Sequence, residues 1–162
     1  MLGPCPIAFR RLAGGRLAAP EALMQFVPAA SRWFTLDELA AYNGTDAALP
    51  LLLSIGGEVF DISEGARFYG PDGPYRMFAA RDSTRALTKG SLDESDWSGP
   101  AALLLDDFNE REWTAVVEQV EFYRDKYRLV GALRDGVVIS EATARKLGGV
   151  ALGVWQARRG GE

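Results

Sequence analysis

The sequence of 162 residues contains no histidine. This absence excludes Ser-His-Asp and Cys-His hydrolases, zinc sites with histidine ligands, and haem held between two histidines. Cysteine is nearly absent too, because Cys5 is the single one, and one thiol excludes an internal disulfide and a cysteine-rich zinc site. Any metal would therefore need tyrosine, aspartate, glutamate, methionine, Cys5 or backbone ligands.

The sequence also lacks a surplus of basic residues and a long hydrophobic run. The net charge is −4 and the pI is about 5.0, so we expect no nucleic-acid partner. The longest apolar candidate, residues 147–157, is glycine-rich and shorter than the roughly 20 apolar residues that span a bilayer. We therefore expect no transmembrane helix of the chain's own, although this segment could lie on a membrane surface or in a partner's groove.

The composition divides the chain into three parts. Residues 1–33 carry four arginines and one acidic residue, which is typical of organelle transit peptides but also of an ordinary low-complexity tail. We expect a compact domain over residues 34–133 and a C-terminal extension over residues 134–162. A tail of this composition rarely orders alone, so we expect a partner protein to hold it.

Local patterns predict short helices and hairpins in the domain. Thr35 and Glu38 form a capping box at a helix start, and two short apolar runs flank Gly56-Gly57 as in a tight hairpin. Residues 91–105 are expected to form a loop, and residues 127–140 a second hairpin. Together these elements predict a small α+β domain.

The longest predicted helix covers residues 107–127, with Asp106 and Asp107 as its caps. Apolar residues recur along it at steps of three and four, which predicts one buried stripe. The stripe consists of Trp113, Val116, Val117, Val120, Tyr123 and Tyr127.

Four segments together resemble a known family. They are FTLDELAAYNG from residue 34, LLLSIGGEVFDIS from residue 51, FYGPDGPYRMFAARDSTRA from residue 68, and FYRDKYRLVGAL from residue 122. Their order and spacing resemble the membrane-associated progesterone receptor family, with its relatives neudesin and neuferricin. These proteins are variants of the cytochrome b5-like haem/steroid-binding fold.

The resemblance implies a haem b cofactor held by one tyrosinate, which agrees with the missing histidines. By the family's motif, Tyr75 is the axial ligand of the haem iron and Tyr69 lines the pocket and forms hydrogen bonds near it. Lys126 and Tyr127 match the pair that contacts the haem edge and propionates. The chain departs from the family at Ala80, where glycine is usual and a side chain would crowd a close backbone approach.

Each of these residues also has a purely structural interpretation. Tyr75 could be a half-buried aromatic beside a turn, and Tyr69 could pack in the domain with its hydroxyl hydrogen-bonded. Lys126 suits the C-terminal end of a helix dipole, and Tyr127 lies on the apolar stripe. The adjacent Arg81-Asp82 pair is typical of a loop anchor or a helix cap.

Two functions follow from these residues. The first is a haem-binding module that senses, stores or delivers haem or modulates a partner protein. The alternative, which does not exclude the first, is a non-catalytic accessory or structural subunit of a larger membrane-associated complex, in which the fold is a scaffold with or without haem and the extensions wrap neighbouring subunits. No nucleophile–base set or phosphate loop is present, so we expect no enzyme activity.

The resemblance also bears on assembly and compartment. Family members can stack through open haem faces, so a haem-dependent dimer could form. The arginine-rich N-terminal segment favours a mitochondrial, membrane-associated location, whereas the family's habit favours the endoplasmic reticulum. Steroid binding is implied by the family name alone.

Overall fold

The computed structural model describes residues 10–11, 16–18, 32–140 and 142–143. Cys5, most of the predicted N-terminal extension and the apolar segment 147–157 lie outside these residues. In the part of the chain so described, no helix combines the length and the apolar character that crossing a bilayer requires.

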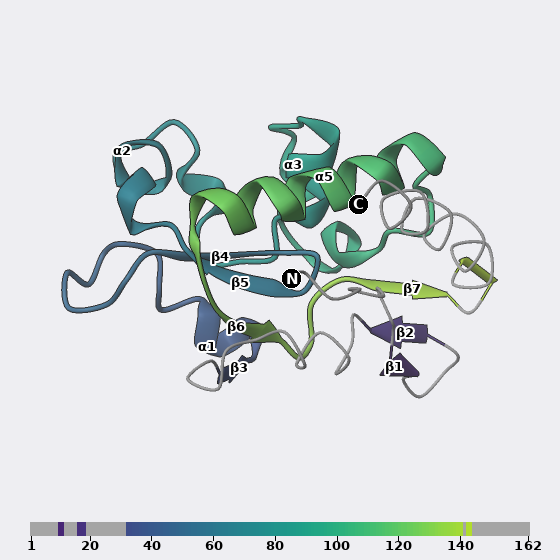
Figure 1. Ribbon diagram of the computed structural model, residues 1–162, viewed down its shortest axis with the longest axis horizontal. Helices are drawn as coiled ribbons and strands as arrows, with labels where there is room; N and C mark the ends of the chain where they lie inside the picture. Colours follow the sequence, from purple (N-terminus) through teal and green to yellow (C-terminus); the bar gives the residue numbers. More distant parts are fainter. Residues whose placement is uncertain (1–9, 12–15, 19–31, 141, 144–162) are drawn as a thin grey trace, which may run out of the picture.

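A four-stranded sheet forms the centre of the domain (Figure 1). Its strands, in spatial order, are β3 (Arg32–Phe34), β6 (Arg128–Leu133), β5 (Glu58–Asp61) and β4 (Leu52–Ile55). The β4–β5 hairpin predicted at Gly56-Gly57 is confirmed, since both glycines have positive φ, +60° and +83°. β3 pairs with β6 in parallel, and the other pairs are antiparallel.

The helices are short except for the last one. They are α1 (Leu36–Leu39), α2 (Ala66–Tyr69), α3 (Thr84–Lys89), α4 (Glu94–Trp97) and α5 (Glu110–Lys126), with 3-10 turns η2 (Ser63–Gly65), η3 (Arg76–Phe78) and η4 (Pro100–Leu103). Figure 1 shows α2, α3 and α5 on one side of the sheet and α1 on the other. The α+β class is confirmed, as is the Thr35–Glu38 capping box on α1.

Buried side chains fill both faces of the sheet. The side that carries α5 holds Leu53, Ile55, Phe60, Ile62 and Tyr123, whereas Phe34, Leu39, Val59 and Leu133 pack on the side of α1. The predicted stripe on α5 faces the sheet, with Trp113, Val116, Tyr123 and Tyr127 buried and Val117 and Val120 partly buried. This packing fixes the C-terminal end of α5 above β4 and β5.

The second predicted hairpin is wrong. β7 (Val138–Ser140) does not pair with β6, because β3 and β5 already occupy both edges of β6. β7 instead pairs with β2 (Arg16–Ala18), which pairs with β1 (Arg10–Arg11), and these three strands form a separate small sheet.

The predicted caps of the long helix are also wrong. Asn109 is the N-cap, and it forms a capping box with Glu112. Asp107 binds Arg85, and Asp106 accepts hydrogen bonds from Ser140 and Thr143.

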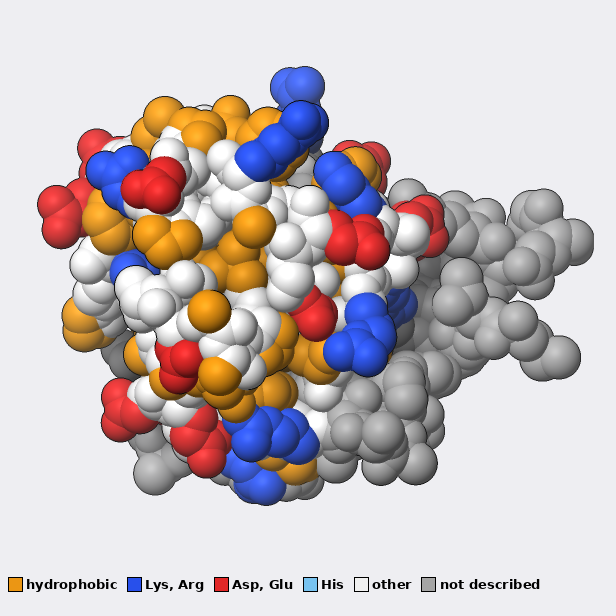
Figure 2. All heavy atoms as spheres, turned by 90° about the vertical axis from the view of Figure 1, so that its left-hand side faces the viewer, with side chains coloured by type: hydrophobic (Ala, Val, Ile, Leu, Met, Phe, Trp, Pro, Cys, Tyr) orange, Lys and Arg blue, Asp and Glu red, His pale blue; other side chains and the backbone are white. Residues whose placement is uncertain are grey.

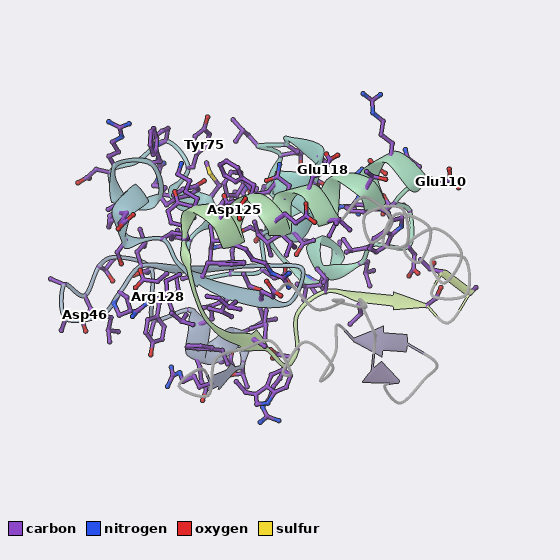
Figure 3. All side chains as sticks on the ribbon, viewed as in Figure 1. Asp46, Tyr75, Glu110, Glu118, Asp125 and Arg128 are labelled. Atoms are coloured by element: carbon purple, nitrogen blue, oxygen red, sulfur yellow. The ribbon has the colours of Figure 1, made fainter. Side chains whose placement is uncertain are left out.

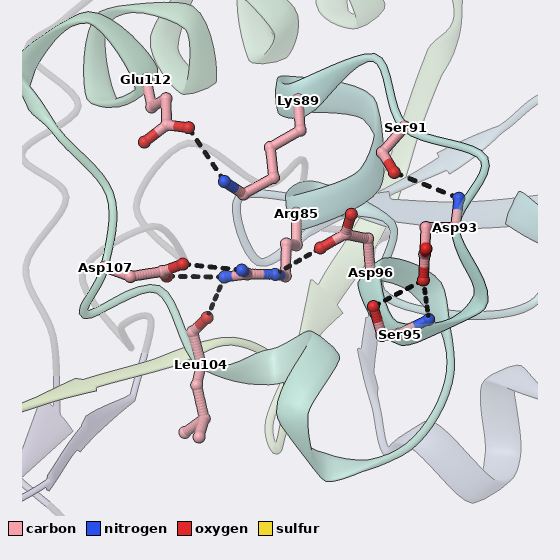
Figure 4. Close-up of polar contacts among 9 residues, drawn as sticks. All are labelled: Arg85, Lys89, Ser91, Asp93, Ser95, Asp96, Leu104, Asp107 and Glu112. Atoms are coloured by element: carbon pink, nitrogen blue, oxygen red, sulfur yellow. Dashed lines mark hydrogen bonds and ion pairs between the residues drawn. The ribbon is translucent and has the colours of Figure 1, made fainter.

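The predicted loop 91–105 contains α4 and η4 rather than loop alone. Asp93 caps α4 by accepting a hydrogen bond from the Ser95 amide, 2.9 Å away. Figure 4 shows how Arg85 ties this segment to α3, with bonds to Asp96, the Leu104 carbonyl and Asp107.

Candidate functional site

The loop between α2 and η3 carries both tyrosines of the Gly-Pro motif. It folds back on α2, because the Tyr75 amide donates to the Phe68 carbonyl at 2.8 Å and the Gly73 amide donates to the Gly70 carbonyl at 2.9 Å. A side chain at Gly73 would overlap the Phe68 carbonyl. The glycine therefore allows the close backbone contact that sets the position of Tyr75.

Three of the predicted site residues lie together with a fourth tyrosine. The Tyr69 and Tyr75 rings are 6.2 Å apart, and the Tyr69 hydroxyl lies 2.7 Å from the Tyr123 hydroxyl. The rings of Tyr123 and Tyr127 are 5.4 Å apart. We call Tyr69, Tyr75, Tyr123 and Tyr127 the tyrosine cluster; α2, the motif loop and α5 contribute to it.

The cluster runs from the core to the surface. Tyr123 is 2% exposed, Tyr127 is buried, Tyr69 is half-buried and Tyr75 is 42% exposed. Figure 3 shows Tyr75 on the side of the sheet that carries α5. Within the described residues the Tyr75 hydroxyl makes no hydrogen bond, and its exposure makes Tyr75 the phenol of the cluster that a ligand can reach.

Aromatic side chains lie beside Tyr75 on the motif loop and beside Tyr123 on α5. The Phe78 ring is stacked on that of Tyr75, with 6.0 Å between centroids and 15° between planes. Phe122 is an exposed large apolar side chain on α5, and its ring contacts Tyr123 at 5.5 Å. A flat apolar ligand could therefore find aromatic contacts on both the motif loop and α5.

Lys126 lies at the border of the cluster rather than within it. Its side chain is exposed, and its ammonium lies 5.4 Å from the ring centroids of both Phe122 and Tyr127. These cation–π contacts hold a positive charge beside the exposed aromatic surface. Such a charge is suited to pair with the carboxylate of a bound ligand.

The hydroxyls of Tyr69 and Tyr123 are neutral phenols at physiological pH. Burial raises the pKa of Tyr69, and the neighbouring Tyr127 and Tyr75 add to this, whereas the bond to Tyr123 opposes it. Burial also raises the pKa of Tyr123, and its hydrogen bond to Tyr69 acts in the same direction. Both groups therefore keep a proton to donate.

A buried ion pair anchors α5 on the sheet. Glu58 of β5 is buried, and it accepts from Arg124 Nε at 2.8 Å and also from the terminal guanidinium nitrogen Nη2. Arg124 lies between Tyr123 and Lys126 in sequence, so this pair fixes the rotation of the helix that presents them.

Ala80 adopts a left-handed conformation, with φ of +60°. Its amide donates to the Leu52 carbonyl at 2.7 Å, which ties the end of the motif to β4. The departure from the family's glycine thus falls where a side chain strains the backbone.

Asp82 acts as a structural anchor. The buried carboxylate accepts hydrogen bonds from Thr84 and from the Val137 amide. Burial raises its pKa, although these hydrogen bonds lower it in part. The acid therefore joins α3 to the chain before β7.

A separate hollow of about 580 Å³ lies next to α2. It is lined by the loop around Asp46 and by Arg67 and Asp72, with Leu49, Leu51 and Pro71 among the apolar contributors. Figure 2 looks onto this end of the molecule, where side chains of both charges surround hydrophobic ones. Since none of the four predicted site residues lines it, we place the candidate site at the tyrosine cluster.

Comparison with known proteins assigns the family. The model of the cytochrome b5-like heme/steroid binding domain matches residues 35–134. The chain belongs to this family. The expected cytochrome b5-like fold is thereby confirmed, together with the resemblance to membrane-associated progesterone receptor proteins.

Several curated relatives match the same region. Probable steroid-binding protein 3 of Arabidopsis thaliana is 41% identical over 98 residues, covering 60% of this chain and 94% of that protein. Membrane steroid-binding protein 2 of the same plant is 46% identical over 65 residues, or 40% of this chain and 28% of that protein. Cytochrome P450 regulator dap1 of Schizosaccharomyces pombe is 39% identical over 105 residues, or 63% of each. The chain thus spans less than two thirds of the last two proteins.

A solved structure supports the fold. An Arabidopsis thaliana protein described as having a cytochrome b5 like fold matches with a TM-score of 0.55 and 37% identity. The match covers 65% of this chain and 93% of that protein.

Sequence reasoning missed one member of the cluster as a site residue. Tyr123 was predicted only as part of the apolar stripe, yet its hydroxyl reaches Tyr69 across 54 residues of sequence. The available signal was its spacing of four residues from Tyr127, which places both rings on the same face of α5.

Proposed function

We propose that this protein is a haem-binding module with Tyr75 as the axial ligand of the iron. The observation that carries the proposal is Tyr75 at the outer end of the tyrosine cluster, where the residue is 42% exposed and its hydroxyl makes no hydrogen bond within the described residues. Tyrosinate is an established haem ligand in proteins, and it needs no histidine. The donor set of this chain therefore fits haem b.

The neighbouring residues have separate roles in this proposal. Tyr69 borders the ligand and supplies a neutral phenol for hydrogen bonding. Tyr127 adds an aromatic wall, and Lys126 places its charge where a propionate can pair with it. Phe122 adds an exposed apolar side chain next to Tyr123 and Lys126 on α5.

The bound haem would supply a ferric centre with one open face, and an anionic phenolate favours the ferric state. We infer a role in storing haem or delivering it to partner proteins, or in modulating them, without catalysis by the chain itself. One relative is named as a cytochrome P450 regulator, which supports the proposal that this chain modulates a protein partner. A haem-dependent dimer through the open face belongs to the same proposal.

The relatives named membrane steroid-binding proteins support association with a membrane. For the organelle we favour the mitochondrion over the endoplasmic reticulum, on the arginine-rich residues 1–33. Fractionation of cells that express the tagged full chain tests both statements. Recovery in the cytosol alone would contradict the membrane assignment, and recovery in microsomes would contradict the organelle.

The decisive experiment compares absorption spectra of the full chain after haem reconstitution. We expect a high-spin ferric phenolate spectrum in the wild type and its loss in Tyr75→Phe. Tyr42→Phe is the matched control, because Tyr42 packs on Phe34 and accepts a hydrogen bond from Arg32 outside the cluster. An unchanged spectrum in Tyr75→Phe would refute the ligand assignment.

One observation favours the accessory-subunit alternative. Strands β1, β2 and β7 lie outside the residues that match the family model, and they form a second sheet that a haem domain does not require. If the wild-type chain binds no haem, this alternative replaces the first proposal. The test is then co-purification of the full chain with a stable set of partner subunits.

A further inference from the structure

The Tyr123 hydroxyl has one hydrogen-bond partner in the described part of the chain. The side chain lies in the core between Phe60, whose ring is 5.8 Å away, and Tyr127. Leu53, Ile55 and Ile62 belong to the same apolar cluster. Because these neighbours are apolar, the Tyr69 oxygen, 2.7 Å away, is the acceptor available to the Tyr123 proton within the described residues.

The direction of that hydrogen bond follows from burial. Either hydroxyl could be the donor by geometry, but if Tyr123 only accepted, its buried proton would have no hydrogen-bond partner, which is costly. Donation from Tyr123 to Tyr69 avoids this cost, because the half-buried Tyr69 can direct its own proton elsewhere. Because a phenol has one proton, the proton of Tyr69 remains free for an acceptor elsewhere.

The neighbours of Tyr69 restrict the direction in which its hydroxyl proton can point. Tyr69 is half-buried, its inner side is occupied by Tyr123, and its ring borders that of Tyr75 at 6.2 Å. Gly65 closes another side, since a side chain there would come within 3.1 Å of the Tyr69 ring. The other two phenols of the cluster border Tyr69 on its remaining sides, Tyr127 beside Gly65 and Tyr75 toward the surface, and of these two the side of Tyr75 is the exposed one.

We propose that Tyr123 is a positioning residue. Its hydrogen bond to Tyr69 makes Tyr69 direct its own proton toward Tyr75, on the exposed side of the cluster where a ligand can bind. In the haem-loaded protein the acceptor is the Tyr75 oxygen, so this part rests on the proposed function. A hydrogen bond to a phenolate withdraws charge from it. Tyr123 therefore weakens the preference of the iron for the ferric state without touching the haem.

The first experiment uses the apoprotein and is independent of haem. In NMR spectra of full-length protein with labelled tyrosine rings, we expect one slowly exchanging hydroxyl proton, correlated with the Tyr123 ring. It should disappear in Tyr123→Phe and persist in Tyr42→Phe. A protected proton correlated with the Tyr69 ring would overturn the direction, and so would the absence of any protected tyrosine hydroxyl.

The second experiment measures the reduction potential of the haem-loaded chain. Without the Tyr123 donor, the Tyr69 hydroxyl is a weaker donor to the Tyr75 oxygen, so Tyr123→Phe should raise the ferric-to-ferrous ratio at a fixed applied potential about twofold. In a Tyr69→Phe background the same change should have no effect, because Tyr123 acts through Tyr69. Equal effects in both backgrounds, or no effect in the wild-type background, would overturn the positioning role.

The two experiments separate this inference from the proposed function. If the wild type fails to bind haem, the proposed function and the role toward Tyr75 both fail. The NMR result still decides whether Tyr123 orients Tyr69. If haem binds through Tyr75 but the double-variant comparison shows independent effects, only the present inference falls.

Discussion

Replacing Arg85 by leucine should remove most of the anchoring of the 91–107 segment to α3. Arg85 Nε binds Asp96 at 2.7 Å, two guanidinium nitrogens bind Asp107 at 2.6 and 2.7 Å, and one of them also donates to the Leu104 carbonyl at 2.9 Å. Figure 4 shows these bonds converging on one side chain. Leucine keeps the apolar stem but none of the bonds.

The magnitude depends on how exposed each partner is. Arg85 and Asp96 are 15% and 16% exposed, so this charged hydrogen bond should contribute about 2 kcal/mol. Asp107 is 55% exposed, which reduces its contribution to about 0.5 kcal/mol. With about 1 kcal/mol for the bond to the Leu104 carbonyl, Arg85→Leu should lower the free energy of unfolding by about 3.5 kcal/mol at pH 7.

The effect should depend on pH with a definite sign. The hydrogen bond from Arg85 lowers the pKa of Asp107, and the Ser91 hydroxyl followed by Arg85 lowers that of Asp96. A carboxyl group whose pKa is lower in the folded state stabilises the protein at pH values above its ordinary pKa of about 4. This stabilisation is lost as the pH falls through the pKa of the folded state. The difference between wild type and Arg85→Leu should therefore shrink below pH 4.

Urea unfolding of the full chain at pH 7 and pH 3 measures the loss in free energy of unfolding and its dependence on pH. Arg111→Leu is the control, because Arg111 is an exposed arginine on α5 and its loss should change the free energy of unfolding by less than about 0.5 kcal/mol. A loss below 1 kcal/mol for Arg85→Leu at pH 7, or a loss equal at both pH values, would refute the reasoning.

Three further substitutions test other parts of the molecule. Gly73→Ala should weaken haem binding at least about tenfold, because the new methyl group would displace the Phe68 carbonyl and the loop that carries Tyr75. Haem titration followed by absorbance measures the affinity, and an unchanged affinity would contradict this prediction. Glu58→Gln should cost about 3 kcal/mol in urea unfolding, because it leaves Arg124 facing a neutral partner, and a cost below 1 kcal/mol would show that the pair contributes little. Gly131→Ala should lower the melting temperature and cost about 2 kcal/mol or more, because its methyl group would overlap the backbone of β3; an unchanged melting temperature would rule out that close contact.

The fold could be predicted from sequence wherever a local pattern determines it. Gly56-Gly57 and the apolar runs beside it specify the first hairpin, and the stripe on α5 specifies which face is buried. The spacing alone did not identify the cap of α5, because Asp107 precedes Glu110 by three residues just as Asn109 precedes Glu112.

Nonlocal pairing could not be predicted in the same way. The turn at Asp135-Gly136 has the composition of a hairpin, but composition does not reveal that β3 already occupies the free edge of β6. The left-handed backbone at Ala80 has a similar cause, since alanine gives no local signal for a positive φ. Only the resemblance to a family with glycine there indicated a special position.

The candidate site was predicted by its motif rather than by periodicity. The spacing of Tyr69 and Tyr75 alone does not distinguish a turn aromatic from a ligand. The structure brings both tyrosines to the C-terminal end of α5, where Tyr127 also lies. Tyr123 was missed as a partner because helical periodicity gives the direction of a side chain but not the atom that its hydroxyl meets.

The parallel pairing of β3 with β6 also constrains the order in which the chain can fold during synthesis. Arg32 pairs with Gly131, and the Leu36 amide donates to Asp135 across 99 residues of sequence. The β4–β5 hairpin can form as soon as it leaves the ribosome, because its contacts are local. The sheet, however, stays incomplete until β6 is made, and the apolar face of the hairpin remains uncovered until α5 follows it. A nascent chain stalled before residue 110 should therefore bind chaperones, and one released after β6 should not.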